Sequence, residues 1–267
     1  MNNQPKYRRP LNPNQLKTLQ LIFKFRYITA PLLTQAINKK ARRTTQQTLQ
    51  ILEEQKYLGK RYNANHRLQG KQAAYYLLPK AVHELRDRYN FNKTILNSML
   101  RNYSLSDSFI EHHLDILRAY IGLQRQYPNT FHIFTKYELG DFDYFLKPLP
   151  DLYLHQQKAE PGKPREFLLD LYADTPLFVV KRRVDAHIKH SESEDWQTTT
   201  SSDYPTVLIG CPNARIEANI QTYATRKLDQ SEFDITILTS STKAMFGTSA
   251  RIWSNTTLPE ELLTLDL

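Results

Sequence analysis

Two acidic residues occupy positions from which carboxylates on neighbouring strands can do metal chemistry. Asp151 follows Pro150, and Asp170 comes 19 positions later, at the end of the apolar run Phe167-Leu168-Leu169. Two such carboxylates can hold Mg²⁺, and a nearby lysine can then align or activate the attacking water. The expected place for that lysine, two positions after the second acid, is occupied by Tyr172.

This spacing resembles the metal site of the PD-(D/E)xK nuclease fold, with Asp151 and Asp170 as its two acids. A displaced cation could come from the basic start of the next predicted helix, namely Lys181, Arg182 or Arg183, and Glu111 could add a further acid. Because the motif lysine is absent, we expect an inactive nuclease-like domain without catalytic residues, metal or cofactor. Mg²⁺ belongs only to the alternative of an active nuclease. In the plain structural interpretation, Asp151 is a turn residue and Asp170 a strand-end acid.

A second group of residues has the chemistry of DNA recognition. Polar side chains on a helix in the major groove can reach base edges, and flanking cations can hold phosphates. On a predicted helix over 41–55, the base-reading candidates are Arg42, Arg43, Thr44, Gln46, Gln47 and Gln50. The phosphate-binding candidates are Lys39, Lys40, Arg61, Arg67 and Lys71. Alternatively, the glutamines are ordinary residues of a helix surface.

The charge is divided unevenly along the chain. The net charge is +9, but residues 1–103 hold 20 Lys and Arg against 4 Asp and Glu, whereas residues 104–267 hold 16 against 23. An excess of 16 positive charges on about a hundred residues favours a polyanionic partner, which we expect to be double-stranded DNA. The alternative is a solvated basic face that serves solubility.

The elements that would carry these residues follow the order of a winged helix-turn-helix. Asn12-Pro13 predicts a helix start, Thr29 caps a second helix, and Gly59 ends the third. Strands at 60–63 and 73–78 then flank a polar, basic hairpin tip at 64–72. The segment LEEQKYLGKR before a strand ending in YYLLPKA resembles that family, over residues 12–90.

Beyond a polar stretch at 90–106, a long helix is predicted from Asp107 to about Tyr127. Its neighbours His112 and His113 point about 100° apart, so they are poorly placed to share a metal ion. Its apolar stripe can pack on the second domain or on another copy, which makes a homodimer plausible. The predicted domains are a winged helix-turn-helix at 1–100, a connector helix at 101–129 and an α/β nuclease-like domain at 130–267.

The third segment alternates strands and helices and predicts a mixed sheet. The expected strands are 131–137, 151–155, 166–172, 206–209 and 235–239, and the expected helices are 177–190, 214–228 and 242–246. Residues 191–203 (SESEDWQTTTSSD) are predicted to be an exposed loop. The fold class is therefore α+β or α/β, with a restriction-endonuclease-like second domain.

Taken together, these segments resemble the replication-relaxation family of plasmids and related mobile elements. The resemblance rests on the N-terminal part together with FIEHHLDILRAYIGL, PDLYL, EFLLDLYADTP, YPTVLIGCPNAR and a final RIW. It implies a DNA-binding protein of plasmid replication or relaxation, with replication or mobilisation proteins as partners. The family's second acid, two positions after the first, is replaced here by Tyr172, with Thr175 following.

Several protein classes are disfavoured by composition. No run approaches the roughly 20 apolar residues of a membrane span, and the N-terminus lacks the apolar stretch of a secretory signal, so we expect a cytoplasmic protein that does not bind membranes. The single cysteine, Cys211, excludes an intramolecular disulfide and a four-cysteine zinc site. Two functions remain as alternatives to replication control: a Mg²⁺-dependent nuclease, and a transcriptional regulator whose acidic part senses a ligand or partner.

Overall fold

The computed structural model describes residues 10–39, 41–157, 164–173 and 175–266. The chain separates into two compact units, Met1–Leu105 and Ser106–Leu267. The long helix that follows residue 105 is therefore counted with the second unit.

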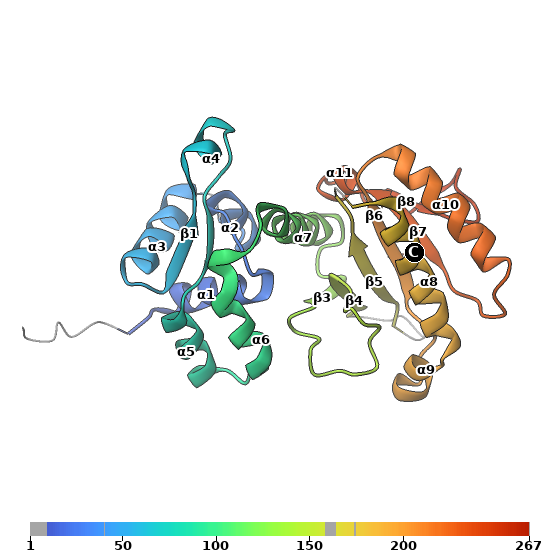
Figure 1. The fold of residues 1–267 in the computed structure, drawn as a ribbon, viewed down its shortest axis with the longest axis horizontal. Coiled ribbons are helices and arrows are strands. Elements are labelled where there is room, and N and C mark those ends of the chain that lie inside the picture. The colour runs from blue at the N-terminus through green and yellow to red at the C-terminus, as the bar shows by residue number, and fades with distance from the viewer. Residues whose placement is uncertain (1–9, 40, 158–163, 174, 267) are drawn as a thin grey trace, which may run out of the picture. The chain divides into compact units, whose positions relative to one another are not determined.

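The first unit is built from helices and one short ribbon (Figure 1). Its elements are α1 (Pro13–Phe25), α2 (Ala30–Ala36), α3 (Arg42–Glu54), β1 (Leu58–Arg61), α4 (Ala64–Leu68), β2 (Ala74–Leu77), α5 (Pro79–Arg88), α6 (Lys93–Ser98) and the 3-10 helix η1 (Met99–Ser104). A capping box between Asn12 and Gln15 starts α1, and the Thr29 side chain caps α2. These local signals lie where the sequence predicted the two helix starts.

The core of the first unit lies between the first three helices and the ribbon. Leu19 and Ile22 of α1, Leu33 of α2, and Leu49 of α3 are fully buried. Strands β1 and β2 pair antiparallel, from Leu58 opposite Leu77 to Arg61 opposite Ala74. The apolar face of α3 therefore points inward, and its polar face is left on the surface.

Two segments of the first unit contain structure that the sequence did not predict. The hairpin tip at 64–72 holds a helical turn, α4, which Asn63 caps by accepting a hydrogen bond from the His66 backbone. The stretch 90–106, expected to be merely polar, contains α6 and η1. The buried Asn102 of η1 accepts a bond from the Arg26 side chain (2.6 Å), so a long-range contact supports this segment.

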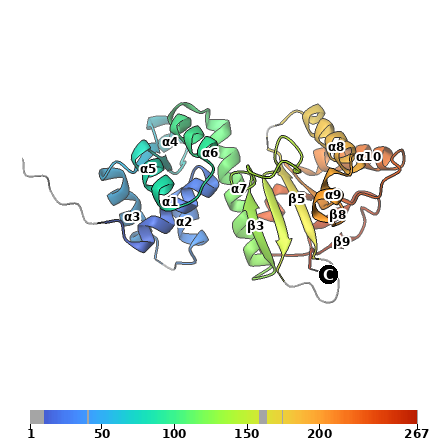
Figure 2. The ribbon, with the colours of Figure 1, turned by 90° about the horizontal axis from the view of Figure 1, so that it is seen from below.

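The second unit is a mixed seven-stranded sheet with helices on both faces (Figures 1 and 2). Its strands, in spatial order, are β3 (Phe131–Thr135), β4 (Leu152–Gln156), β5 (Glu166–Leu171), β6 (Thr206–Cys211), β7 (Ile237–Ser241), β8 (Trp253–Asn255) and β9 (Leu262–Leu263). β5, β6 and β7 are parallel, and the other neighbours pair antiparallel. The predicted mixed α and β architecture with a mixed sheet is confirmed.

The helices of this unit are α7 (Asp107–Gln126), α8 (Leu177–Glu192), α9 (Asp195–Thr200), α10 (Ala214–Leu228) and α11 (Thr242–Met245). α8 and α10 cover one face, where Val180 and Ile220 pack against Ile209. α7 and α11 lie over the other face, on which Leu171 and Gly210 are neighbours and Met245 of α11 lies against Gly122 of α7. Among the described residues, no helix is both long and apolar enough to cross a bilayer.

The prediction of an exposed loop at 191–203 was wrong. α8 continues to Glu192, and α9 follows at once. Trp196 of α9 is 1% exposed and packs edge-on against Tyr144 and Phe145. One large aromatic side chain thus anchors a segment whose other residues are polar.

Candidate nucleic-acid interface and buried carboxylates

Helix α3 presents a polar face to solvent. Thr45, Leu49 and Leu52 are buried beneath it. The exposed residues include all six predicted base-reading positions: Arg42, Arg43, Thr44, Gln46, Gln47 and Gln50. The helix therefore presents amide and guanidinium groups to solvent, which are groups that can form hydrogen bonds with base edges.

Intramolecular contacts separate two of these six residues from three others. Arg42 donates through Nη2 to the Gln72 side chain (2.7 Å), and Gln50 donates to Glu54 (2.9 Å). In the part of the chain that the structure describes, the side chains of Arg43, Gln46 and Gln47 make no such contact, and they line an open groove beside α3. These three have donors and acceptors available for a ligand.

The same groove also indicates which part of α3 a polyanion would contact. Glu53 and Glu54 line its far end, and Glu53 pairs with Lys60 of β1 (2.8 Å). Carboxylates repel phosphates, so the N-terminal half of α3, which carries Arg42 and Arg43 and no acid, is the favourable half.

The predicted phosphate-binding residues differ in their surroundings. Arg67 and Lys71 are exposed on the ribbon tip, and Lys39 is partly buried in a small cleft that the exposed Lys17 also lines. Lys40 lies outside the described residues. Arg61 has a structural role instead, because its Nη1 donates to the Tyr103 and Leu105 carbonyls (2.7 and 3.0 Å). Lys17, which the sequence analysis did not single out, joins the candidates.

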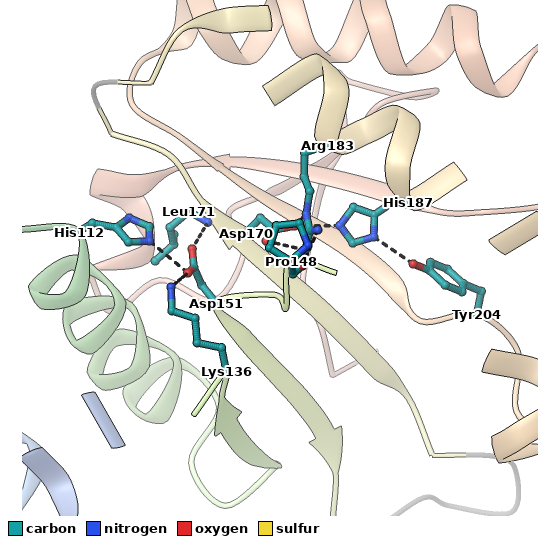
Figure 3. A network of polar contacts seen from close by, with 9 residues as sticks. All are labelled: His112, Lys136, Pro148, Asp151, Asp170, Leu171, Arg183, His187 and Tyr204. Atoms are coloured by element: carbon teal, nitrogen blue, oxygen red, sulfur yellow. Dashed lines mark hydrogen bonds and ion pairs between the residues drawn. The ribbon is translucent and has the colours of Figure 1, made fainter. Parts of the chain in front are cut away.

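In the second unit, Asp151 is buried with all its oxygens in use (Figure 3). Oδ1 accepts from Lys136 Nζ (2.9 Å) and faces His112 Nε2 (3.1 Å). Oδ2 accepts from the Leu171 backbone N–H (3.1 Å). Burial by itself raises the pKa of Asp151, but Lys136 and His112 outweigh it and lower the pKa well below its usual value. The carboxylate is held ionised by protein groups.

Asp170 has a separate set of partners, which α8 provides (Figure 3). Arg183 of α8 binds it through two hydrogen bonds, Nε to Oδ2 (2.7 Å) and Nη2 to Oδ1 (3.1 Å). His187 Nε2 lies 2.8 Å from Oδ2. Burial by itself raises the pKa of Asp170. Arg183 and His187 lower it by a larger amount, so the pKa of Asp170 lies below its usual value.

His187 continues this network to Tyr204. Burial lowers the pKa of His187 despite the nearby Asp170, which favours a neutral imidazole. In this neutral form, the Nε2–H group donates to Asp170, and Nδ1 accepts from the Tyr204 hydroxyl (3.0 Å). Every polar atom along this line has a partner.

These two carboxylates do not fit a Mg²⁺ site. A metal needs carboxylate oxygens that are free to coordinate it, yet all four oxygens of Asp151 and Asp170 already accept from protein donors or lie against them. Each charge is balanced by its own cation, Lys136 or Arg183. Across the described ranges, no group of three or more His, Cys, Asp or Glu side chains is arranged to hold a metal ion.

The other predicted members of the site lie elsewhere. Lys181 lies over the Tyr223 ring, 5.0 Å from its centroid, so it is not the cation that neutralises Asp170. Glu111 faces Arg118 (3.5 Å) and is not an additional acid beside Asp151 in this arrangement. The sequence analysis missed Lys136 and His187, because no local spacing relates them to the acids.

No family model matches the chain, and no curated protein matches it. Among solved structures, it is similar to the restriction endonuclease FokI bound to DNA, with a TM-score of 0.32 and 10% identity over 87% of this chain. The chain spans 43% of the length of that protein. A TM-score at this level does not establish a common fold, so the replication-relaxation, winged-helix and restriction-endonuclease-like assignments stay predictions.

Proposed function

We propose that the chain binds duplex DNA through its first unit, with α2 and α3 as a helix-turn-helix, α3 in the major groove and the β1–β2 ribbon as the wing. The observation that carries this proposal is the exposed polar face of α3, where Arg43, Gln46 and Gln47 have no intramolecular partner among the described residues. Residues 1–52 contain ten Lys and Arg and no acid, so nothing in that segment opposes a phosphate backbone.

The chemistry of the three side chains fits base recognition. An α-helix fits the major groove, where arginine can bind guanine and glutamine can bind adenine through paired hydrogen bonds. Their pairing with the wrong base costs about 1–3 kcal/mol each. The sequence preference of the protein therefore resides in α3, and the flanking cations provide affinity that does not depend on sequence.

The second unit, in this proposal, supports DNA binding without catalysis. Its acids form ion pairs with Lys136 and Arg183, so cleavage that depends on Asp151 and Asp170 is not expected. The role we propose for the bound DNA, the replication or relaxation of a plasmid-like element, follows from the family resemblance alone. Pairing of two copies on one site is part of the same proposal.

Binding is tested with duplexes selected from a random library by the purified protein. Each lost base contact costs about 1–3 kcal/mol, so the triple variant Arg43→Ala, Gln46→Ala, Gln47→Ala should lose its preference for the selected site and keep weak general binding. The matched control is Arg215→Ala, Asn219→Ala, Thr222→Ala, on the exposed surface of α10. Unchanged selectivity of the α3 variant would place the reading surface elsewhere.

Two further measurements separate the alternatives. A map of bound sites in cells distinguishes replication control, which places them at a plasmid origin, from transcriptional regulation, which places them at promoters. Incubation of supercoiled, linear and single-stranded DNA with Mg²⁺ or Mn²⁺ should give no cleavage. Cleavage that needs Mg²⁺ or Mn²⁺, and that Asp151→Ala plus Asp170→Ala abolishes while the emission of the buried Trp196 and Trp253 shows a folded second unit, would instead establish the nuclease.

A further inference from the structure

The ribbon tip, residues Tyr62–Ala73 between β1 and β2, is an ordered structure rather than a plain turn. Helical turn α4 is closed by two backbone bonds typical of a helix end, from Gly70 to the Arg67 carbonyl (3.1 Å) and from Lys71 to the His66 carbonyl (2.9 Å). Gly70 has φ +66°, a conformation that glycine adopts without strain. In Figure 1, α4 lies at the far end of the ribbon.

This ordered tip holds one apolar side chain out into solvent. Leu68, in the last turn of α4, is 85% exposed, the largest fraction among the large apolar residues that the structure describes. Its neighbours Arg67 and Lys71 are exposed cations. Residues 55–83 contain six Lys and Arg and no acid.

An apolar group inside a cationic surface matches one ligand class well. Duplex DNA has phosphates outside and stacked apolar bases within, and proteins that enter the minor groove push leucine or similar wedges between base steps. A protein partner with an acidic rim would suit the cations equally. However, both ends of α3 hold the ribbon: Arg42 at its start binds Gln72 (2.7 Å), and Glu53 near its end pairs with Lys60 (2.8 Å). This arrangement favours one ligand that touches both α3 and the ribbon.

We infer that Leu68 is a wedge that enters the minor groove beside the site read by α3, partly unstacks one base step and bends the DNA. This inference rests on the proposed function, since α3 must lie in the adjacent major groove. Arg67 and Lys71 hold the phosphates on either side of the opened step. Flexible pyrimidine–purine steps, which unstack most easily, are the preferred position for Leu68.

The bend is measured by energy transfer between dyes at the two ends of selected duplexes of about 30 base pairs, the length over which such bends are defined. A 2-aminopurine at the central step reports unstacking. The wild type should bend the duplex by an angle within about 20–90° and raise the 2-aminopurine emission. Leu68→Ala should lose most of both signals, and Leu68→Met should keep them. The DNA affinity of Leu68→Ala should fall less than about tenfold, because the phosphate contacts remain.

The matched control is Leu258→Ala, which removes a 66% exposed leucine from the second unit and should change neither signal. Wild-type protein that binds straight DNA, or Leu68→Ala protein that bends it as the wild type does, would overturn the wedge and leave DNA binding intact. A change of the free protein from dimer to monomer in Leu68→Ala, without any change in bending, would assign Leu68 to a second copy instead. Absence of binding to any duplex would remove the proposed function and the wedge together.

Discussion

The ion pair of Asp170 with Arg183 allows a decisive test of whether the second unit is a metal site or a fold stabilised by internal charge pairs. The substitution Asp170→Asn keeps the shape of the side chain and removes its charge. It leaves the Arg183 guanidinium, 7% exposed, without its counter-ion. Loss of one partner of a buried ion pair costs about 3–5 kcal/mol.

The expected size of the effect follows from the length of the unit, Ser106–Leu267. In domains of about 150–250 residues, 1 kcal/mol corresponds to about 2–4 °C in Tm. Asp170→Asn should therefore lower the Tm of the second unit by about 6–20 °C. The additional substitution Arg183→Met should recover much of this loss, because no buried charge is then left without a partner.

Tryptophan fluorescence is the suitable assay during thermal unfolding. Both tryptophans, Trp196 and Trp253, lie in the second unit and are buried, so their emission reports this unit alone. The control Asp234→Asn changes an exposed acid and should leave Tm unchanged. In an empty metal site, by contrast, neighbouring carboxylates repel each other, so removal of one charge would raise the Tm of the variant or leave it unchanged. Either result for Asp170→Asn would refute the ion-pair interpretation.

Three other predictions concern pH, salt and packing. Burial lowers the pKa of His113 to about 3, whereas a histidine in the unfolded chain titrates near 6.5. Between these pH values the unfolded chain binds more protons than the folded one. The free energy of unfolding of the second unit should therefore fall by about 2 kcal/mol from pH 7 to pH 5. His113→Asn should reduce that slope, and an unchanged slope would contradict the assignment. If about 6–10 phosphates are neutralised, DNA affinity should fall about 10³–10⁵-fold between 50 and 200 mM salt. Fluorescence anisotropy can measure this decrease. An affinity that does not depend on salt would exclude the proposed contacts between cations and phosphates. A Cβ on Gly122 would lie 1.9 Å from the Met245 carbonyl oxygen. Gly122→Ala should therefore destabilise the second unit by about 1–3 kcal/mol, as measured by unfolding in denaturant. A variant as stable as the wild type would show that α11 can shift without an energetic cost.

Elements with strong local signals could be predicted from the sequence. The helix Ala214–Leu228 was predicted with the bounds that the structure shows, and in the structure Asn213 caps its start. The strands β3 to β7 were each located to within two residues, with β6 extending to Cys211. Periodicity and capping depend on neighbours in sequence, and this is why they were sufficient here.

The missed features depend on residues far apart in the chain. α9 forms because Trp196 enters a cluster with Tyr144 and Phe145, about 50 positions earlier, and the composition of its own segment predicts a loop. Lys136 precedes Asp151 by 15 positions, at the other end of the segment between β3 and β4, and Arg183 follows Asp170 by 13, on the next helix. The acids could be found by spacing, and Arg183 was one of the three cations that the sequence offered. Lys136 could not be found in this way, because only the fold brings it to Asp151.

The way these acids are neutralised bears on where a polyanion can bind. Lys136 and Arg183 are committed to Asp151 and Asp170, so they add nothing to the attraction of phosphates. The rest of residues 104–267 carries an acidic excess that gives the segment a net charge of −7. If the protein binds DNA as proposed, long-range electrostatics favour contact with the first unit and oppose it over most of the second. In the proposed function, the ion pairs that occupy Asp151 and Asp170 thus leave the attraction of DNA to the cations of the first unit.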